Sequence, residues 1–171
     1  MFKKVAMSTS VLALALASSA ALAVPQQHDI TVIADIPGTD FYVQPEDMST
    51  IRDEQRLLWN QTTSKLEGIT RMFKVKSSTG AAAGPDVEAT LMEAAEIVDI
   101  ANASNKINLN VSFNGRALTT VGTPVVVVDS GDATTEMRAP LVITPVEPAS
   151  PGYVEGNYRG FVKVMFDAPS P

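Results

Sequence analysis

The segment that most constrains the fold of this chain is residues 107–113, where apolar and polar side chains alternate without a break. The odd-numbered residues are apolar and would share one face of an extended strand, because successive side chains of a strand point to opposite faces. Asn114 and Gly115 follow at once, and this pair favours a two-residue hairpin turn because both positions adopt positive φ. The pattern predicts a strand with one buried face, followed by a partner strand over residues 116–121.

Similar short apolar patterns recur along the chain and predict eight or nine strands separated by turns. The further strands are expected at residues 28–36, 56–60, 69–75, 87–91, 125–128, 140–146 and 158–166, with a short extended piece followed by a loop at 39–53. Residues 94–100 have helical spacing and favour a one- or two-turn helix, with a loop as the alternative. Short strands in one unit of this size predict an all-β fold, an antiparallel β-sandwich.

Three local features complete this interpretation. Residues 77–85 are rich in serine, glycine and alanine and predict a loop. Pro145, within the strand at 140–146, and Pro148 and Pro151 after it indicate an edge position followed by a loop, because proline donates no hydrogen bond to a neighbouring strand. Trp59, the one tryptophan, is expected in the core rather than in a binding site.

Residues 1–23 have the features of a secretory signal peptide. Lys3 and Lys4 give a positive start, residues 11–17 are an apolar run, and Ala21-Leu-Ala23 fits the cleavage pattern. Cleavage would leave 148 residues that begin at Val24, a usual size for one domain. We therefore expect an exported protein.

Charge and cysteine content exclude several classes of protein. The mature chain would keep 11 basic and 19 acidic residues, a net charge of −8, which argues against nucleic acid and anionic lipid as partners. The absence of cysteine excludes disulfides, thiolate metal sites and cysteine nucleophiles. Stability must come from core packing and strand pairing, or from a neighbouring molecule.

The sequence offers little for catalysis or for a cofactor. His28 is the one histidine and would lie beside the mature N-terminus, and no hydrolase, nucleotide-binding or zinc-protease motif is present. An acidic set could hold Ca²⁺ through its oxygens, but its spacing fits no known loop and favours a solvated face. This set is Asp86, Glu88, Glu93, Glu96 and Asp99. We expect no enzyme, no metal and no cofactor.

Three stretches together resemble one protein family. They are the strand His28–Ile36, the hairpin Leu109–Gly115 and the ending Gly156–Met165. In this order, behind a signal peptide, they are similar to the major pilins of the class 5, or α-type, chaperone–usher fimbriae, typified by colonization factor antigen I and the cable pilus. The resemblance spans nearly the whole mature chain.

The resemblance implies an incomplete immunoglobulin-like sandwich that is completed by a strand from a neighbouring subunit. A periplasmic chaperone would lend that strand first, and the N-terminal extension of the next pilin would replace it at an outer-membrane usher. The implied organisation is a signal peptide at 1–23, a donor-strand extension at 24–37 and a pilin domain at 38–171. The implied donor residues are Ile30, Val32, Ala34 and Ile36. The implied edge of the acceptor groove is Tyr158, Val162, Val164 and Phe166.

The function that follows is a structural subunit of a surface fimbrium used in adhesion, with identical or related pilins as partners and a host receptor as a further possible partner of the fibre. A minor or tip subunit is an alternative. A self-contained secreted β-sandwich that binds a ligand is another, in which residues 28–36 pair within their own chain. A secreted hydrolase of unfamiliar type would need converging carboxylates, for which the sequence shows no defined pair.

Overall fold

The structure is a computed structural model that describes residues 40–49, 53–120, 122, 124–149 and 152–169. The chain divides into two units, residues 1–35 and 36–171, and all described residues belong to the second. The expected signal peptide and the strand at 28–36 therefore lie outside the described residues.

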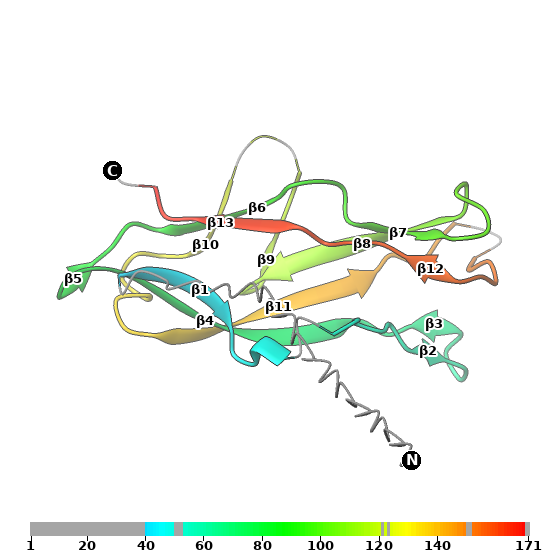
Figure 1. Ribbon diagram of the computed structural model, residues 1–171, viewed down its shortest axis with the longest axis horizontal. Coiled ribbons are helices and arrows are strands. Elements are labelled where there is room, and N and C mark those ends of the chain that lie inside the picture. Colours follow the sequence, from blue (N-terminus) through cyan, green and yellow to red (C-terminus); the bar gives the residue numbers. More distant parts are fainter. Residues whose placement is uncertain (1–39, 50–52, 121, 123, 150–151, 170–171) are drawn as a thin grey trace, which may run out of the picture. The chain divides into compact units, whose positions relative to one another are not determined.

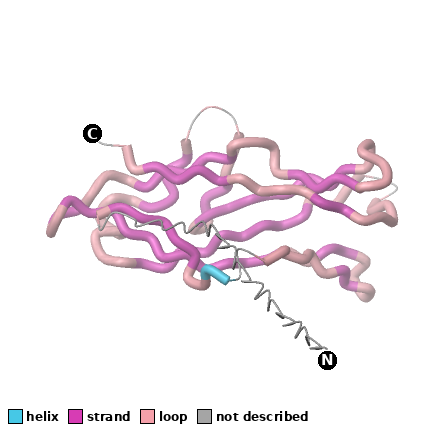
Figure 2. The backbone as a smooth tube through the Cα atoms, in the orientation of Figure 1, coloured by secondary structure: helices cyan, strands magenta, loops and turns pink. Residues whose placement is uncertain are grey.

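The described part of the second unit is built from antiparallel strands (Figure 1). Figure 2 shows that loops and turns connect most of them directly. The strands are β1 (Phe41–Pro45), β2 (Trp59–Asn60), β3 (Lys65–Leu66), β4 (Ile69–Thr79), β5 (Ala82–Ala83), β6 (Val87–Leu91), β7 (Glu96–Asp99), β8 (Lys106–Phe113), β9 (Arg116–Ala117), β10 (Val125–Val128), β11 (Met137–Pro145), β12 (Tyr158–Arg159) and β13 (Val164–Asp167).

The strands form two main sheets that enclose one core. The first sheet has the order β1-β4-β11-β8-β7-β12, with β5 paired to β4 and β9 paired to β8. The second sheet has the order β10-β6-β13, and β2 pairs separately with β3. The expected all-β antiparallel sandwich is thus confirmed.

The core contains the inward side chains of both sheets. Every second residue of β8 is buried, as the alternation over 107–113 predicts, and the buried residues of β6 face it from the second sheet. Three phenylalanines meet in the centre: the ring centroid of Phe113 lies 5.7 Å from that of Phe73 and 4.7 Å from that of Phe166. The fully buried members of this core are Val75, Val87, Ala89, Phe113, Ala133 and Ala139.

The hairpin after β8 has the expected turn. Asn114 and Gly115 have φ values of 48° and 77°, so both adopt the left-handed conformation of this type of turn. The returning strand β9 contains only two residues and is shorter than the predicted 116–121.

Residues 94–100 do not form the predicted helix. Residues 96–99 are strand β7, which pairs with β8, and the N–H of Leu109 donates to the carbonyl oxygen of Ala95 at 2.8 Å. A short apolar spacing does not separate a helical turn from a strand, and pairing with β8 decides the outcome here. The predicted loop at 77–85 is also partly wrong, because β4 continues to Thr79 and Ser77 is fully buried.

The predicted edge position of residues 140–146 is wrong, because β11 lies between β4 and β8. Pro140 and Pro145 are tolerated in this central strand. At each of the two positions a backbone N–H would point past the end of the neighbouring strand on that side, so proline leaves no partner group unpaired. The ladder with β8 begins at Leu141, and the carbonyl oxygen of Pro140 accepts from the turn residue Asn114. The ladder with β4 ends at Ile143, before Pro145. No ladder hydrogen bond is therefore lost.

The C-terminal segment is divided between the two sheets, whereas the sequence predicts one strand over 158–166. β12 pairs with β7 in the first sheet, and β13 pairs with β6 in the second. Between them Gly160 passes so close to β7 that a Cβ atom there would overlap the carbonyl oxygen of Glu96. Glycine therefore permits the crossing at this point.

Candidate functional site

Among the described residues each main sheet has two end strands that pair on one side only, β1 and β12 in the first sheet and β10 and β13 in the second. On one side of the sandwich the end strands are β1, which pairs with β4, and β13, which pairs with β6. The other edge of each strand carries backbone N–H and C=O groups available to a further strand.

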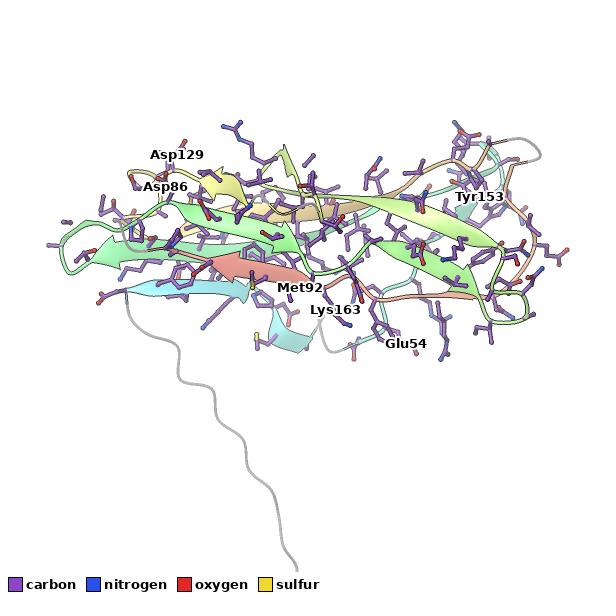
Figure 3. All side chains as sticks on the ribbon, turned by 90° about the horizontal axis from the view of Figure 1, so that it is seen from above. Glu54, Asp86, Met92, Asp129, Tyr153 and Lys163 are labelled. Atoms are coloured by element: carbon purple, nitrogen blue, oxygen red, sulfur yellow. The ribbon has the colours of Figure 1, made fainter. Side chains whose placement is uncertain are left out.

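The end strands β1 and β13 lie on the same side of the sandwich. At the opposite end of the second sheet, β10 lies over the β8–β9 hairpin, where the side-chain amide of Asn114 donates to the carbonyl oxygen of Val127 at 2.9 Å. β13 is therefore displaced toward β4 and β1, and the ring centroid of Phe166 lies 6.2 Å from that of Phe73 on β4. Figures 1 and 3 both show β13 and β1 along the same side.

Apolar side chains line this side from both strands. Phe41 and Val43 of β1 and Val164 and Phe166 of β13 are only half-buried, although all four pack against the core. Val87, an inward residue of the central strand β6, is by contrast fully buried. The difference arises because the described residues place no strand outside β1 or β13. We call these four residues, with Val162, the open rim.

The open rim is suited to one kind of interaction. An extended segment that inserts beside β13 or β1 would pair with the unpaired backbone groups and place alternate side chains against the half-buried apolar ones. Such an insertion would also cover two exposed sheet edges, which otherwise invite uncontrolled strand pairing.

Three of the four predicted acceptor residues lie together in the open rim. Val162 precedes β13, and Val164 and Phe166 belong to it. Their outward neighbours are exposed, as the alternation predicts, with Phe161 at 79% and Met165 at 47%. Tyr158 instead lies on β12 in the first sheet, and its hydroxyl donates to the carbonyl oxygen of Val154 at 2.9 Å. The acceptor role of all four stays a prediction.

The predicted donor residues Ile30, Val32, Ala34 and Ile36 lie outside the described residues, as does His28. Phe41 and Val43 are not among the acceptor residues that the sequence predicts. Their alternation with Tyr42 and Gln44 is the signal that could have identified β1 as the second half of the rim.

Two groups on the outer face of the first sheet near β1, Tyr42 and Glu136, have shifted pKa values. The hydroxyl of Tyr42 donates to Glu136 at 2.8 Å, and Lys74 lies 3.3 Å from the same carboxylate. The hydrogen bond from Tyr42, and then the one from Lys74, lower the pKa of Glu136. Burial, with the hydrogen bond to Glu136, raises the pKa of Tyr42. These groups lie on the outer face of the sheet, away from the core.

Two open depressions lie on the described surface. One, of about 330 Å³, is lined by residues of β7 and by Arg159, Gly160 and Phe161. The acidic set that could have bound Ca²⁺ is dispersed: Glu96 pairs with Lys106, Glu93 pairs with Lys163, and Asp99 is buried. Within the described ranges no three His, Cys, Asp or Glu residues are grouped to hold a metal.

Two other expectations are resolved by the described part of the chain. Trp59 is not a core residue, since it is 47% exposed and its ring contacts Tyr153 edge-to-face at 5.4 Å. Its strand β2 belongs to a small hairpin outside the two main sheets, so the prediction of burial is wrong. No helix among the described residues is long and apolar enough to cross a membrane.

Comparison with solved structures gives the fold of a pilin. The CooA pilin subunit of enterotoxigenic Escherichia coli matches with a TM-score of 0.50 and 19% identity, over 65% of this chain and 75% of CooA. A chaperone–tip adhesin complex from the biogenesis of CFA/I fimbriae matches with a TM-score of 0.45 and 9% identity, over 77% of this chain and 43% of the other. No curated protein sequence matches the chain significantly.

The family comparison agrees with the fold. The family model of the CS1 type fimbrial major subunit matches residues 26–167, which is most of the sequence. This chain therefore belongs to the CS1 type fimbrial major subunit family.

Proposed function

We propose that this chain polymerises into a surface fimbrium by donor-strand exchange. In this proposal residues 24–37 leave their own domain and insert beside the open rim of a neighbouring subunit. The same subunit receives the corresponding segment of the next copy, so each copy both donates and accepts one strand. Family membership supports a structural fimbrial subunit.

The single observation that carries the proposal is the open rim. Both sheets end on one side, with apolar side chains half-buried between those ends, and this arrangement supports the insertion of one further strand there. The donor segment has a matching pattern, because its even-numbered residues from Ile30 to Ile36 are apolar. The rim has unpaired backbone groups and half-buried apolar residues, and the donor segment has the alternating apolar side chains to cover them.

Burial supplies the driving force for insertion. Complete burial of the three large side chains Ile30, Val32 and Ile36 would contribute about 5–9 kcal/mol, at about 1.5–3 kcal/mol each. Backbone hydrogen bonds along β13 would add register and specificity. A chain without cysteine has no disulfide to stabilise the open sandwich, so the neighbouring strand takes that role.

The open rim also explains why other proteins would assist assembly. An apolar sheet edge exposed after export would aggregate unless a temporary partner covers it. We propose a periplasmic chaperone that lends a strand to the rim, and an outer-membrane usher at which the donor segment of the next subunit replaces it. Residues 1–23 would direct export as a cleaved signal peptide.

The test compares two substitutions in the donor segment, made in the full chain expressed with its chaperone and usher. Val32→Asp places a charge on the face that insertion buries, so we expect normal yields of chaperone–subunit complex and no fibres. Thr31→Asp, on the opposite face, is the matched control and should form fibres close to normal. Complex yield is measured by copurification and fibres by electron microscopy.

The outcome distinguishes exchange from self-pairing. If residues 28–36 pair within their own chain, Val32→Asp removes a core residue and destabilises the monomer by several kcal/mol. A poor yield of complex, or normal fibres from Val32→Asp, would therefore contradict the proposal. A stable monomer of the wild-type chain without any chaperone would favour a self-contained binding module.

A further inference from the structure

The turn after β8 carries the one Asn-Gly pair of the chain, Asn114-Gly115. Such a pair is reactive in a flexible chain, because the backbone nitrogen that follows an asparagine can attack the carbonyl carbon of the side-chain amide. Glycine hinders this attack least, since it has no side chain and reaches conformations that other residues avoid. Every other asparagine precedes a larger residue. The turn therefore contains the position of this sequence that is best suited to deamidation.

The reaction consumes only water. The nitrogen of Gly115 forms a bond to the side-chain carbon Cγ of Asn114, and the bond between Cγ and Nδ2 breaks. The proton of the Gly115 N–H leaves with the amide nitrogen as ammonia, and a cyclic succinimide remains. Water then opens the ring at one of its carbonyl carbons and gives aspartate or isoaspartate. Overall one amide is hydrolysed, without oxidation or reduction.

The folded turn holds Asn114 away from this reaction. Its backbone N–H donates to the carbonyl oxygen of Pro140 at 2.9 Å, and its side-chain Nδ2 donates to the carbonyl oxygen of Val127 at 2.9 Å. The flanking residues Phe113 and Arg116 are paired across the hairpin. Ring closure turns the side chain back onto its own main chain, so the bond to Val127 has to break first. Gly115 is exposed, so water is at hand once the side chain is released.

The same hydrogen bond joins the two sheets on the side away from the open rim. Asn114 belongs to the β8–β9 hairpin of the first sheet, whereas Val127 belongs to β10 of the second. Deamidation replaces the donor Nδ2 with an oxygen of a carboxylate, which only accepts hydrogen bonds when ionised. Two acceptors then face each other, and the carbonyl group of Val127 loses this partner. Isoaspartate would in addition lengthen the main chain within the turn.

We propose that Asn114 is a deamidation site that is protected while β10 is docked on the hairpin and reacts when the two separate. The product cannot restore the bond between the sheets, so the reaction marks an opened subunit irreversibly. Among the described residues the second sheet has three strands, with β6 between β10 and β13, so an uncovered β13 weakens the same small sheet that holds β10. One consequence rests on the proposed function: a subunit left without chaperone or donor strand is deamidated, and a covered one is preserved.

The test uses the chaperone–subunit complex obtained from the full chain, incubated at mildly alkaline pH with and without denaturing urea. Trypsin releases residues 107–116 as one peptide, because it cleaves after Lys106 and Arg116. This peptide also contains Asn108 and Asn110, which precede leucine and valine and are internal controls. We expect deamidation of Asn114 alone in urea, and a rate at least about tenfold lower in the native complex, where the site reacts only through local opening. Mass spectrometry measures both rates.

Two valine substitutions test whether the docking of β10 provides the protection. Val128→Ala removes buried packing from β10, so deamidation of Asn114 in the native complex should become several-fold faster. Val75→Ala is the matched control, because Val75 is also buried but belongs to β4 of the first sheet. It should leave the rate close to that of the wild type.

A second pair of variants tests the effect of the product. Asn114→Asp reproduces one product of the reaction and should lower the yield of chaperone–subunit complex several-fold. Asn110→Asp makes the same change of charge on the exposed face of β8 and should leave the yield close to normal. Equal yields from the two variants would show that the product is harmless and would overturn its proposed effect.

The results separate this proposal from donor-strand exchange. An Asn114 that stays intact in urea is no deamidation site, and one that reacts as fast in the native complex as in urea is not protected by the fold. Equal acceleration by Val128→Ala and Val75→Ala would refute protection by β10. If the chain instead forms a stable monomer without a chaperone, donor-strand exchange fails, while the same comparison made on the monomer still decides whether Asn114 is a protected deamidation site.

Discussion

Replacing Gly160 with alanine tests whether the crossing between β12 and β13 sets the position of the open rim. Gly160 lies where the chain leaves the first sheet for the second, against the backbone of β7. A Cβ atom at this position would overlap the carbonyl oxygen of Glu96 and lie 3.0 Å from the Cα atom of Ile97. Both obstacles are backbone atoms of a strand paired with β8, so no side-chain rotation can make room.

The magnitude follows from this obstruction. Residues 160–163 must move away from β7 or the β7–β8 ladder must shift, and overpacking of this kind costs about 1–3 kcal/mol. In a domain of this size each kcal/mol lowers Tm by roughly 2–4 °C, so we expect a decrease of about 2–12 °C. The displacement also moves Val162 and Val164, so capture of the subunit by its chaperone should decrease.

The assay measures thermal unfolding and yield of the chaperone–subunit complex for Gly160→Ala and for Gly131→Ala. Gly131 is a matched control because a Cβ atom there meets nothing within 4 Å. If the free energy of unfolding of Gly160→Ala lies within about 0.5 kcal/mol of that of Gly131→Ala, which is the difference expected of a neutral surface change, the obstruction does not exist and the reasoning is refuted.

Two further predictions concern the rim and the face behind it. Val164→Asp buries an unpaired charge beneath the inserted strand and should abolish chaperone capture and fibre formation, whereas Met165→Asp on the exposed face of the same strand should do neither; copurification measures both. Tyr42→Phe should raise the pKa of Glu136 toward its ordinary value, because it removes the hydrogen bond that lowers that pKa most. A carboxyl group whose pKa is lowered in the folded state contributes stability that is lost as the pH falls through that pKa. The variant should therefore lose less stability on acidification than the wild type. Urea unfolding across the acidic range and NMR titration of Glu136 check this.

The sequence predicts well the parts of the fold in which local pattern and tertiary environment agree. Strand β8 with its Asn114-Gly115 turn and strands β6 and β10 lie where alternation or apolar runs place them. The resemblance to a pilin is confirmed by the family match, and with it the expectation of a structural subunit rather than an enzyme. The half-burial of Val162, Val164 and Phe166 also follows the predicted alternation.

The errors occur where a partner strand decides the outcome. Residues 96–99 become a strand because β8 offers a free edge, which no local spacing reveals. β11 occupies a central position despite Pro140 and Pro145, because each proline lies past the end of the ladder on the side where its N–H would point. The register of β11 with its two neighbours decides this, and the local sequence does not contain that register. The exposure of Trp59 likewise follows from the separate β2–β3 hairpin, not from its sequence neighbours.

The passage of the C-terminal segment from one sheet to the other has a mechanical consequence for a polymer under tension. A donor strand held along β13 would transmit a pull to β13 in shear, with its hydrogen bonds loaded in parallel rather than one after another. The load would then divide, passing to β6 through the β13 ladder and to β7 through the close crossing at Gly160. Both sheets would resist the same pull, so stretching the fibre would tend to clamp the sandwich rather than peel one sheet from the other.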